Sequence, residues 1–439
     1  MLVKVVKFGG SSLADAAQFQ KVAAIIKADP ERRYVVPSAP GKRFREDTKV
    51  TDMLYACYER AARGAEFDGL FAQVRERYDG IIRELGMDYS LDREFAHIQS
   101  AFVNKSGRDY AASRGEYLNG KILAAYLGYD FIDAARVVFF NDDGSFNDEL
   151  THQSLRDELS RHERAVIPGF YGSMPNDTIK TFSRGGSDVT GSLVARAAGA
   201  VLYENWTDVS GFLVADPRIV PNPKQIKRIT YRELRELSYM GATVLHEDAI
   251  FPVRQAGIPI NIKNTNVPSD PGTMIVPESG EGDDAQTITG IAGKKGFSIL
   301  HIEKDMMNQE IGFGLKVLEV LEEREISFEH LPSGIDTMSI VVATEALEGQ
   351  REELLRWIKR RTKADLVELH DGIALIAVVG RGMLKAVGTA ARAFSALAGA
   401  GINIRMIDQG SSELNIIAGI DEDHFEDAIR SIYKEFIGE

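Results

Sequence analysis

The carboxyl-terminal third of the chain contains one pattern twice, and this repeat restricts the fold more than any other feature. Residues 299–302 align with residues 375–378, and the correspondence continues at a constant displacement of 76 positions. Each copy reads as strand, glycine, amphipathic helix, strand, turn, strand and helix. The order βαββαβ predicts two ferredoxin-like units, at 290–367 and 368–439. The alternative, two unrelated α+β segments that align by chance, is disfavoured because the register holds without a gap.

The remainder of the chain, residues 1–285, alternates short β-rich runs with helical periods. Lys4–Phe8 is a β-branched run, and the next segment, Gly9–Ser12, is expected to open a helix. The apolar face of that helix consists of Phe19, Val22, Ala23 and Ile26. Such alternation predicts an α/β domain with a mainly parallel sheet.

Three further segments define the organisation of this part. A second helix is expected at 187–198, and the charged, helix-like stretch 58–112 is expected to form a lobe or a lid. The turn-rich segment 268–272 and the polar run 278–286 are expected to separate this domain from the repeat.

Composition limits the partners and the compartment. The chain has 439 residues, so two to four domains are expected. No apolar run approaches the ~18 residues of a membrane helix. The net charge of −13 argues against nucleic acid or an anionic membrane as the main partner. A single cysteine, Cys57, excludes an internal disulfide and is typical of a cytoplasmic protein.

An acidic chain that binds anions must gather its positive charge locally, and the first candidate follows the first strand. Lys7 ends that strand, and Gly9, Gly10 and Ser11 come directly after it. Glycines let backbone N–H groups approach a phosphate, and a helix N-terminus adds partial positive charge. The spacing differs from that of a P-loop. A plain turn with a serine cap is the alternative.

A second glycine-rich segment, Ser183–Asp188, also opens a helix. Its Arg184 offers a planar fork that binds a carboxylate through two hydrogen bonds, which lysine does not. Asp188 falls in the first turn of the helix, where an ordinary capping residue is the alternative. Two such sites in one domain indicate two anionic substrates.

Two more groups of polar residues are candidates for ligand contacts. One is the pair of turns with Thr207-Asp208 and Asp216-Pro217-Arg218, which could hold a polar ligand or could be ordinary turns. The other is Glu116, which follows a glycine and could bind an ammonium group or lie on the surface. No His or Cys cluster indicates a zinc site, so no protein-held metal is expected. No G-x-S-x-G or G-x-G-x-x-G motif favours a hydrolase or a dehydrogenase.

Taken in order, these motifs resemble those of the aspartate kinases of the amino-acid kinase superfamily. The resemblance includes two more segments, Ser38–Gly41 and Gly241–His246. The repeat is similar to the paired ACT domains of the monofunctional members, and the resemblance covers essentially the whole chain. It implies a three-layer α/β catalytic domain at 1–285, followed by the two ACT domains. It also implies transfer of the γ-phosphoryl group of ATP to the β-carboxylate of L-aspartate, giving 4-phospho-L-aspartate. This is the first step of lysine, threonine and methionine biosynthesis.

The resemblance further implies roles for individual residues. Lys7 would neutralise the transferring phosphoryl group, and Asp188 would orient Lys7 and Mg-ATP. Arg184 would hold the α-carboxylate of aspartate and Glu116 its α-amino group. Further contacts to substrate or phosphate would come from Ser38, Thr51 and Ser187. The nucleotide would be bound by Lys7, Gly9, Gly10, Ser11, Thr207, Asp208, Asp216 and Arg218. The chain departs from the family's pattern at Pro37, Ser183, Ser210 and Leu213.

The implied chemistry agrees with these residue types. The acceptor carboxylate has a reference pKa of about 3.9 and is ionised at neutral pH, so no general base is needed. One anion must approach another, so catalysis should depend on positioning and on neutralisation by Mg²⁺, Lys7 and helix N-termini. ATP and Mg²⁺ are therefore the expected cofactors.

The repeat carries no catalytic candidates and is expected to bind a regulatory amino acid. By the resemblance, the effector lies at the first copy, where Glu329 and Asp336 would pair with the ammonium of lysine. The same site would include Met307, Gly312, Phe328 and Ser333. Threonine is the alternative ligand, and the two acids could instead be merely solvated. A homodimer or a dimer of dimers through the ACT domains is expected.

Two rival functions stay open at this point. One is another amino-acid kinase of the superfamily, such as a glutamate or acetylglutamate kinase. The repeat and the pair Glu116 and Arg184 favour free aspartate over it. The other is a non-catalytic amino-acid sensor that uses only its repeat, which the presence of Lys7, Arg184 and Asp188 opposes.

Overall fold

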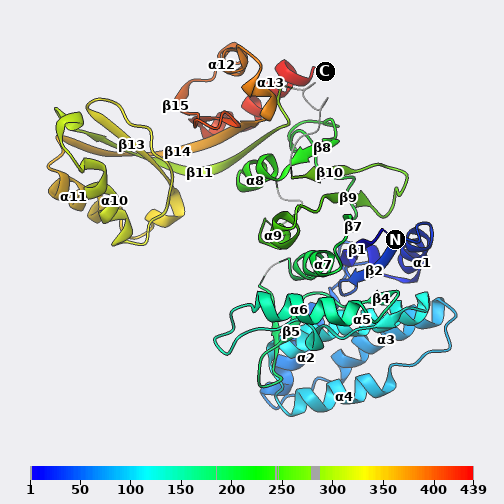
Figure 1. Ribbon diagram of the computed structural model, residues 1–439. Helices are drawn as coiled ribbons and strands as arrows, with labels where there is room; N and C mark the ends of the chain where they lie inside the picture. Colours follow the sequence, from blue (N-terminus) through cyan, green and yellow to red (C-terminus); the bar gives the residue numbers. More distant parts are fainter. Residues whose placement is uncertain (1, 184, 243–244, 246, 278–286, 439) are drawn as a thin grey trace. The chain divides into compact units, whose positions relative to one another are not determined.

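The computed structural model describes residues 2–183, 185–242, 245, 247–277 and 287–438 (Figure 1). The chain forms two compact units. Unit 1 consists of Met1–Phe212, Lys227–Tyr231 and Val244–Ser279, and unit 2 consists of Leu213–Ile226, Arg232–Thr243 and Gly280–Glu439. Three predicted features lie wholly or partly outside the described residues: Arg184, residues 243, 244 and 246 of the Gly241–His246 motif, and the boundary segment 278–286. None of the described helices is long and apolar enough to cross a membrane.

Unit 1 is built on an eight-stranded sheet with the order β3-β4-β2-β1-β7-β9-β10-β8. Its strands are β1 (Lys4–Phe8), β2 (Arg32–Pro37), β3 (Asp130–Phe131), β4 (Ala165–Val166), β7 (Leu202–Thr207), β8 (Arg228–Thr230), β9 (Ile260–Asn264) and β10 (Thr273–Val276). Among these described strands, β9 and β10 pair antiparallel and every other neighbouring pair is parallel. The predicted mainly parallel α/β sheet is therefore confirmed. Segment 268–272 joins β9 to β10 within this sheet.

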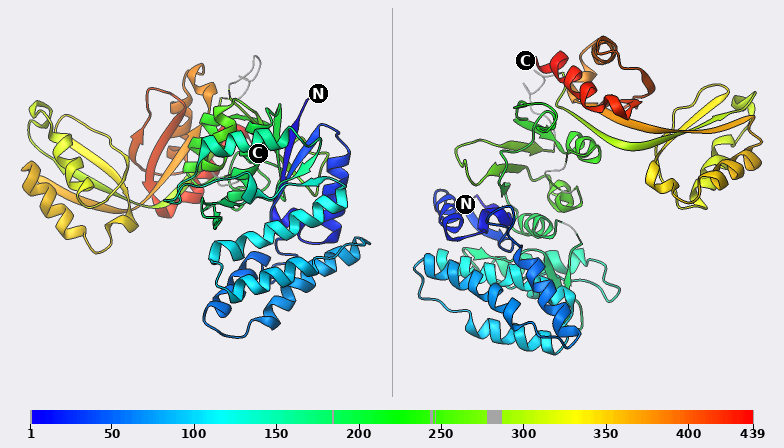
Figure 2. Two further views of the ribbon diagram at one scale, coloured as in Figure 1. Left: turned by 60° about the horizontal axis from the view of Figure 1, so that its bottom comes forward. Right: turned by 180° about the vertical axis from the view of Figure 1, so that it is seen from behind.

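Helices cover the sheet and extend it into a lobe. They are α1 (Ala16–Lys27), α2 (Val50–Ala62), α3 (Asp68–Glu84), α4 (Asp92–Val103), α5 (Arg108–Leu127), α6 (Asp148–Leu159), α7 (Gly186–Ala197) and α9 (Glu247–Gln255), with the hairpin β5 (Tyr171–Ser173) and β6 (Ile179–Thr181). Figures 1 and 2 show α2 to α5 gathered as a lobe, in blue to cyan. This confirms the helical lobe predicted for 58–112. Helix α5 is buried along most of its length, so it is a rigid support for the residues it carries.

One local prediction is wrong. Gly9–Ser12 does not open the α-helix, because Gly10–Leu13 forms a single 3₁₀ turn and α1 begins only at Ala16. Asp15 caps α1 by accepting a hydrogen bond from the backbone N–H of Gln18 at 2.9 Å. The predicted apolar face is confirmed, since Phe19, Val22, Ala23 and Ile26 are all buried.

Unit 2 contains a six-stranded antiparallel sheet with the order β12-β13-β11-β14-β16-β15. Its strands are β11 (Gly290–Glu303), β12 (Phe328–His330), β13 (Thr337–Ala343), β14 (Leu366–Val379), β15 (Ile404–Asp408) and β16 (Asn415–Asp421). Its helices are α10 (Phe313–Glu322), α11 (Arg351–Thr362), α12 (Thr389–Gly399) and α13 (Phe425–Ile437), together with residues 232–239 of α8 (Tyr231–Tyr239).

The two long strands β11 and β14 link the two ferredoxin-like modules (Figure 2). Residues 299–303 of β11 pair with 366–370 of β14 in the first module, whereas 290–294 pair with 375–379 in the second. The fourth strand of the second module is therefore the beginning of β11. Two ferredoxin-like units are confirmed, and a division at residue 367/368 falls inside β14.

Candidate active site

An ion pair in unit 1 joins the two residues predicted to be catalytic. Lys7 Nζ lies 2.7 Å from Asp188 Oδ1, although the residues come from β1 and from the first turn of α7. Lys7 is buried, with 7% of its surface exposed. Because a buried ammonium is costly without a partner, this ion pair fixes the position of Lys7. The structure thus brings together the two predicted catalytic residues.

The glycine loop after β1 is held against its neighbours by backbone contacts. The N–H of Gly9 donates to the carbonyl of Trp206 at 2.9 Å, and the N–H of Gly41 donates to the carbonyl of Gly10 at 2.8 Å. A Cβ on Gly10 would lie 2.9 Å from the carbonyl oxygen of Ala39, so packing requires glycine there. A Cβ on Gly9 would meet protein atoms only at ordinary distances, so nothing in the described protein demands glycine at that position.

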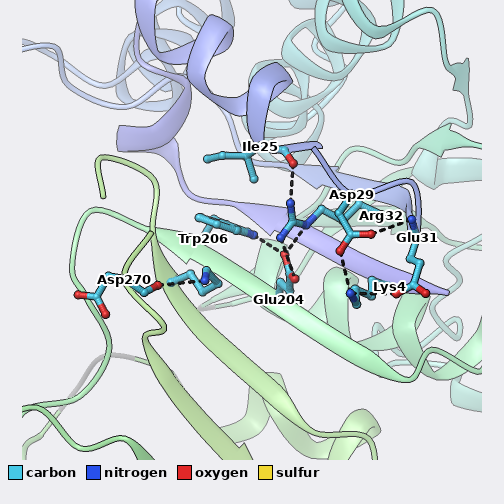
Figure 3. Close-up of polar contacts among 9 residues, drawn as sticks. Lys4, Ile25, Asp29, Glu31, Arg32, Glu204, Trp206 and Asp270 are labelled. Carbon is cyan, nitrogen blue, oxygen red and sulfur yellow. Dashed lines mark hydrogen bonds and ion pairs between the residues drawn. The ribbon is translucent and has the colours of Figure 1, made fainter. Parts of the chain in front are cut away.

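A buried network stabilises the strand that supports this loop. Arg32 donates to Glu204 through Nε and Nη2, at 2.8 and 3.1 Å, and Trp206 Nε1 donates to the same carboxylate at 2.8 Å (Figure 3). Glu204 lies between the two donors in this view. Trp206 is thereby fixed, and its carbonyl in turn holds Gly9.

Glu116 differs from the other described residues of the site because one of its buried carboxylate oxygens has no hydrogen-bond partner. It lies on the buried helix α5, and its Oε2 has no hydrogen-bond partner among the described residues. Burial raises the pKa of its carboxyl group to about 7, against the opposing effect of the Ala39 backbone amide. Buried polar atoms in proteins are almost always satisfied, so an orphaned carboxylate oxygen indicates a missing cationic or donor ligand.

Three other predicted residues lie around the carboxyl ends of β1 and β2. The N–H of Ser38 donates to the carbonyl of Phe8 at 3.0 Å, which sets Ser38 beside the end of β1. A Cβ on Gly115 would lie 3.7 Å from Thr51 Oγ1, so Thr51 is a neighbour of the helix that carries Glu116. A Cβ on Gly169 would lie 2.8 Å from Ser187 Oγ, so Ser187 packs against the segment after β4. Ligands of open parallel sheets bind at this edge.

The residues predicted to bind the nucleotide are spread over several segments and over both units. Ser11 is half-buried in the 3₁₀ turn. Thr207 ends β7, and its hydroxyl donates to the exposed Asp208 at 3.2 Å. Asp216 and Arg218 belong to unit 2, where they pair with each other at 2.6 Å. Arg184 lies outside the described residues.

Two features of the site were missed in the sequence. Asn205 of β7 donates to Asp188 Oδ1 at 2.7 Å. The sequence feature that could have indicated this residue is an amide side chain within a buried strand. Phe170 has a φ of +80°, an unfavourable backbone conformation for an aromatic residue, and a Cβ on Gly186 would lie 2.5 Å from its ring. No sequence pattern indicates this conformation. Strain of this kind concentrates at functional sites.

Lys263, which had no predicted role, lies on β9 beside β7. Its ammonium is 5.2 Å from the centre of the Trp206 ring and donates to the carbonyl of Asp270 at 3.0 Å. Burial lowers the pKa of this amine. A second partly buried cation therefore lies next to the strand that supports the glycine loop.

The predicted effector segments of unit 2 are neighbours in space. The N–H of Lys304 donates to the carbonyl of Asp336 at 2.9 Å, and that of Asn308 donates to the carbonyl of Ile335 at 3.1 Å. Met307 begins a 3₁₀ turn and is buried, and Gly312 caps α10. Phe328, Ser333 and Asp336 are exposed. Lys304, followed by Lys316, holds the pKa of Glu310 in this turn down to about 2.

Glu329, the other predicted effector residue, already has a partner. It is half-buried on β12, and its carboxylate accepts a hydrogen bond from the hydroxyl of Tyr239 on α8. Helix α8 also contacts the second module, where buried Glu233 pairs with Arg381 at 2.9 Å.

Comparison with known proteins identifies the family. Residues 3–264 match the amino acid kinase family, and residues 376–436 match the ACT domain. Aspartokinase 3 of Bacillus subtilis is 42% identical over 451 residues, covering 99% of this chain and 98% of that protein. The crystal structure of Clostridium acetobutylicum aspartate kinase superposes with a TM-score of 0.89 at 51% identity, covering 99% and 100% of the two chains.

More distant relatives share the fold. E. coli aspartokinase III, crystallised with aspartate and ADP, superposes with a TM-score of 0.74 at 24% identity, covering 99% of both chains. The predicted family and activity are thus confirmed. The chain belongs to the amino acid kinase family, and within it to the ATP-dependent aspartate kinases that carry carboxyl-terminal ACT domains.

Proposed function

We propose that phosphoryl transfer in this aspartate kinase depends on Lys7, held by Asp188 at the carboxyl edge of the parallel sheet. The observation that carries the proposal is the largely buried ion pair, with Nζ 2.7 Å from Asp188 Oδ1, next to Gly9 of the glycine loop. The β-carboxylate of aspartate is ionised at neutral pH and attacks without a general base. Lys7 lowers the repulsion between this anion and the phosphates.

Glu116 and Arg184 are the proposed partners of the two α-groups of aspartate. The orphaned Oε2 of Glu116 is suited to the α-ammonium, because a bound cation would satisfy it and favour its ionised form. Arg184 keeps its proposed role at the α-carboxylate from its place in the motif. Ser38, Thr51 and Ser187 are proposed to contact substrate or phosphate.

The phosphates of ATP are proposed to lie along Gly9, Gly10 and Ser11, with Thr207, Asp208, Asp216 and Arg218 as further nucleotide contacts. Among the described residues, no three His, Cys, Asp or Glu side chains converge on one point. Mg²⁺ fits such a site, since it is usually bound by one or two carboxylates together with substrate phosphates. Asp188 is the proposed carboxylate, because its Oδ2 receives no bond from another described residue. Bound Mg²⁺ would supply further charge neutralisation at the phosphates.

The first ACT module is proposed to bind lysine as a feedback effector. The support is the exposed Asp336, whose carbonyl accepts from the N–H of Lys304 next to the turn at 307–312, and the half-buried Glu329 on β12. Phe328 and Ser333 complete the proposed site. E. coli aspartokinase III has been crystallised with lysine and aspartate. Threonine is the second candidate. We further propose a catalytic domain at 1–285, followed at 290–439 by two ACT modules that share β11 and β14. Assembly as a homodimer or a dimer of dimers through the ACT modules, and a cytoplasmic location, are also proposed.

The proposed role of Lys7 is tested by Lys7→Ala, measured in a coupled ADP-release assay with aspartate. Removing one preorganised charge should lower kcat by ~10²-fold or more. Lys4→Ala is the matched control, because Lys4 lies on the same strand and pairs with Asp29 instead. A near-normal kcat in a folded Lys7→Ala enzyme would refute the assignment.

A further inference from the structure

We infer that Asn205 is a positioning residue that holds Lys7 and Asp188 in their working geometry. The inference rests on the catalytic role proposed for Lys7. It adds a residue from a third element, the strand β7, to the pair formed by β1 and α7. Asn205 touches both members of the pair and carries no charge of its own.

The strand register places Asn205 where it must meet Lys7. Strands β1 and β7 are parallel neighbours, and Lys7 lies directly opposite Asn205. Asn205 Oδ1 lies 3.4 Å from Lys7 Nζ, a long hydrogen bond, whereas Nδ2 donates to Asp188 Oδ1 at 2.7 Å. The amide therefore acts mainly on Asp188, and through it on Lys7.

The same face of β7 also fixes the backbone of α7. Tyr203, two residues before Asn205 and so on the same side of the strand, donates its hydroxyl to the carbonyl of Asp188 at 3.3 Å. A Cβ on Gly191 would lie 2.4 Å from that hydroxyl, so this glycine is what lets α7 approach β7 closely. Tyr203 thus fixes the position of the first turn of α7 relative to β7, and Asn205 orients the Asp188 carboxylate within that turn.

An amide suits this position better than an acid or an apolar side chain. It donates to the carboxylate and accepts from the ammonium, so it satisfies both partners without changing the charge of the pair. An aspartate would lie beside Asp188 and draw Lys7 away from the phosphates. A leucine would leave Asp188 Oδ1 with Lys7 alone. Asn205 is 4% exposed, and a polar network this buried depends on every member being satisfied.

The orientation also separates the two oxygens of Asp188. Oδ1 takes the contacts from Lys7 and Asn205, and Oδ2 takes none from another described residue. A carboxylate held at one oxygen keeps the other for a ligand. Losing Asn205 would let the carboxylate rotate, so both the direction of Lys7 and the free oxygen would become less defined.

The test is a double-mutant cycle between Asn205→Leu and Lys7→Met, read as kcat and as KM for each substrate. Asn205→Leu should lower kcat about tenfold with both KM values within about twofold, and Asn205→Asp should lower kcat further. In the Lys7→Met background, Asn205→Leu should change kcat less than twofold, because a positioning residue has no effect without the group it positions.

Asn261→Leu is the matched control, since Asn261 is a buried asparagine on the adjacent strand β9 that does not contact Lys7 or Asp188. Its kcat should stay normal. If Asn205→Leu does not fold, Asn205→Ser replaces it in the same cycle. An unchanged kcat in the folded variant, or an equal loss in both backgrounds, would overturn the inference alone. A near-normal kcat in Lys7→Met would instead overturn the proposed role of Lys7, and the inference with it.

Discussion

The catalytic edge of unit 1 and the effector turn of unit 2 both gather charged side chains, but they hold them differently. At the catalytic edge, Lys7 and Asp188 are partnered by buried protein groups from separate elements. At the effector turn, Asp336 is exposed, and Glu329 is held by the hydroxyl of Tyr239, which is itself 60% exposed. The first arrangement is fixed before any ligand arrives, whereas the second can exchange a protein partner for a ligand.

This difference corresponds to what each region must do. Electrostatic catalysis is strongest when charges are already in place and need no reorganisation. Regulation requires a contact whose two states differ little in free energy, so that an effector selects one of them. Within the catalytic edge, Glu116 resembles the exchangeable class, because one of its oxygens awaits a partner. Variants of Glu116 therefore test most directly whether the catalytic edge differs from the effector turn in this way.

Among the groups that could exchange a partner, the largest effect is expected from Glu116→Gln. The substitution keeps the shape and removes the charge that would meet the α-ammonium. The KM for aspartate should rise about 30-fold, ~2 kcal/mol, with the KM for ATP within about twofold. Glu94→Gln is the control, because Glu94 lies in the same lobe and pairs with Lys121. Equal changes for both substrates would place Glu116 outside the aspartate pocket.

The pH dependence of aspartate binding should show the titration of Glu116 directly. With a pKa of about 7 in the free enzyme, Glu116 is protonated at pH 6, and only its ionised form binds an ammonium. The KM for aspartate should therefore rise about tenfold from pH 8 to pH 6. The Glu116→Gln enzyme should lack this rise, and a wild-type KM that stays flat over the range would contradict the assignment.

The stability of the ligand-free protein should fall as the pH rises, whereas aspartate binding should strengthen. The folded pKa of about 7 lies above the ordinary 4.5, so the folded state binds the proton more tightly than the unfolded state does. This contribution is present below about pH 4.5 and is lost as the pH rises through 7, at a cost of roughly 3 kcal/mol. The difference in thermal unfolding between wild type and Glu116→Gln, measured across this pH range, separates the contribution of Glu116 from that of other titrating groups.

Sequence motifs predicted the charged residues of the catalytic edge better than they predicted the neighbouring residues that hold them in place. Lys7 and Asp188 lie in short motifs with recognisable spacing, and the structure joins them as a pair. The orphaned state of Glu116 could not be predicted, because it depends on the burial of a helix whose sequence is not strongly amphipathic. Asn205 was missed because its role arises from strand register, which no local pattern encodes.

The order of helices and strands was predicted from the sequence, but the sharing of strands between the two modules was not. The repeat indicated two βαββαβ units, which the sheet confirms. That β11 supplies a strand to both modules follows from its pairing with β14 at both ends, at 290–294 and at 299–303. A repeat in sequence shows which segments are alike, but the pairing partner of each half-strand is decided by tertiary packing.

A smaller effect is expected from neutralising the proposed effector acids. The double variant Glu329→Gln and Asp336→Asn should raise the lysine concentration for half-inhibition about tenfold, a modest change because both acids are partly or fully exposed. The second module provides the control, since Arg405 and Ser412 occupy the equivalent positions and offer no carboxylate. Arg405→Gln with Ser412→Ala should leave lysine inhibition unchanged. The reverse pattern would move the effector to the second module, and parallel titrations with threonine would identify the other ligand.

The smallest effect, and the most informative for the comparison, is expected from Tyr239→Phe. The Tyr239 hydroxyl occupies the carboxylate that lysine is proposed to bind, so the effector must displace it or share it. Removing the hydroxyl should strengthen lysine binding about threefold, ~0.7 kcal/mol, measured by isothermal titration calorimetry. Tyr433→Phe is the control, because the Tyr433 hydroxyl accepts from the N–H of Lys224 and is remote in function from Glu329. Weaker lysine binding in Tyr239→Phe would show that the bond positions Glu329 instead of competing for it. The effector site would then be as preorganised as the catalytic edge, and the proposed distinction between fixed and exchangeable charges would fail.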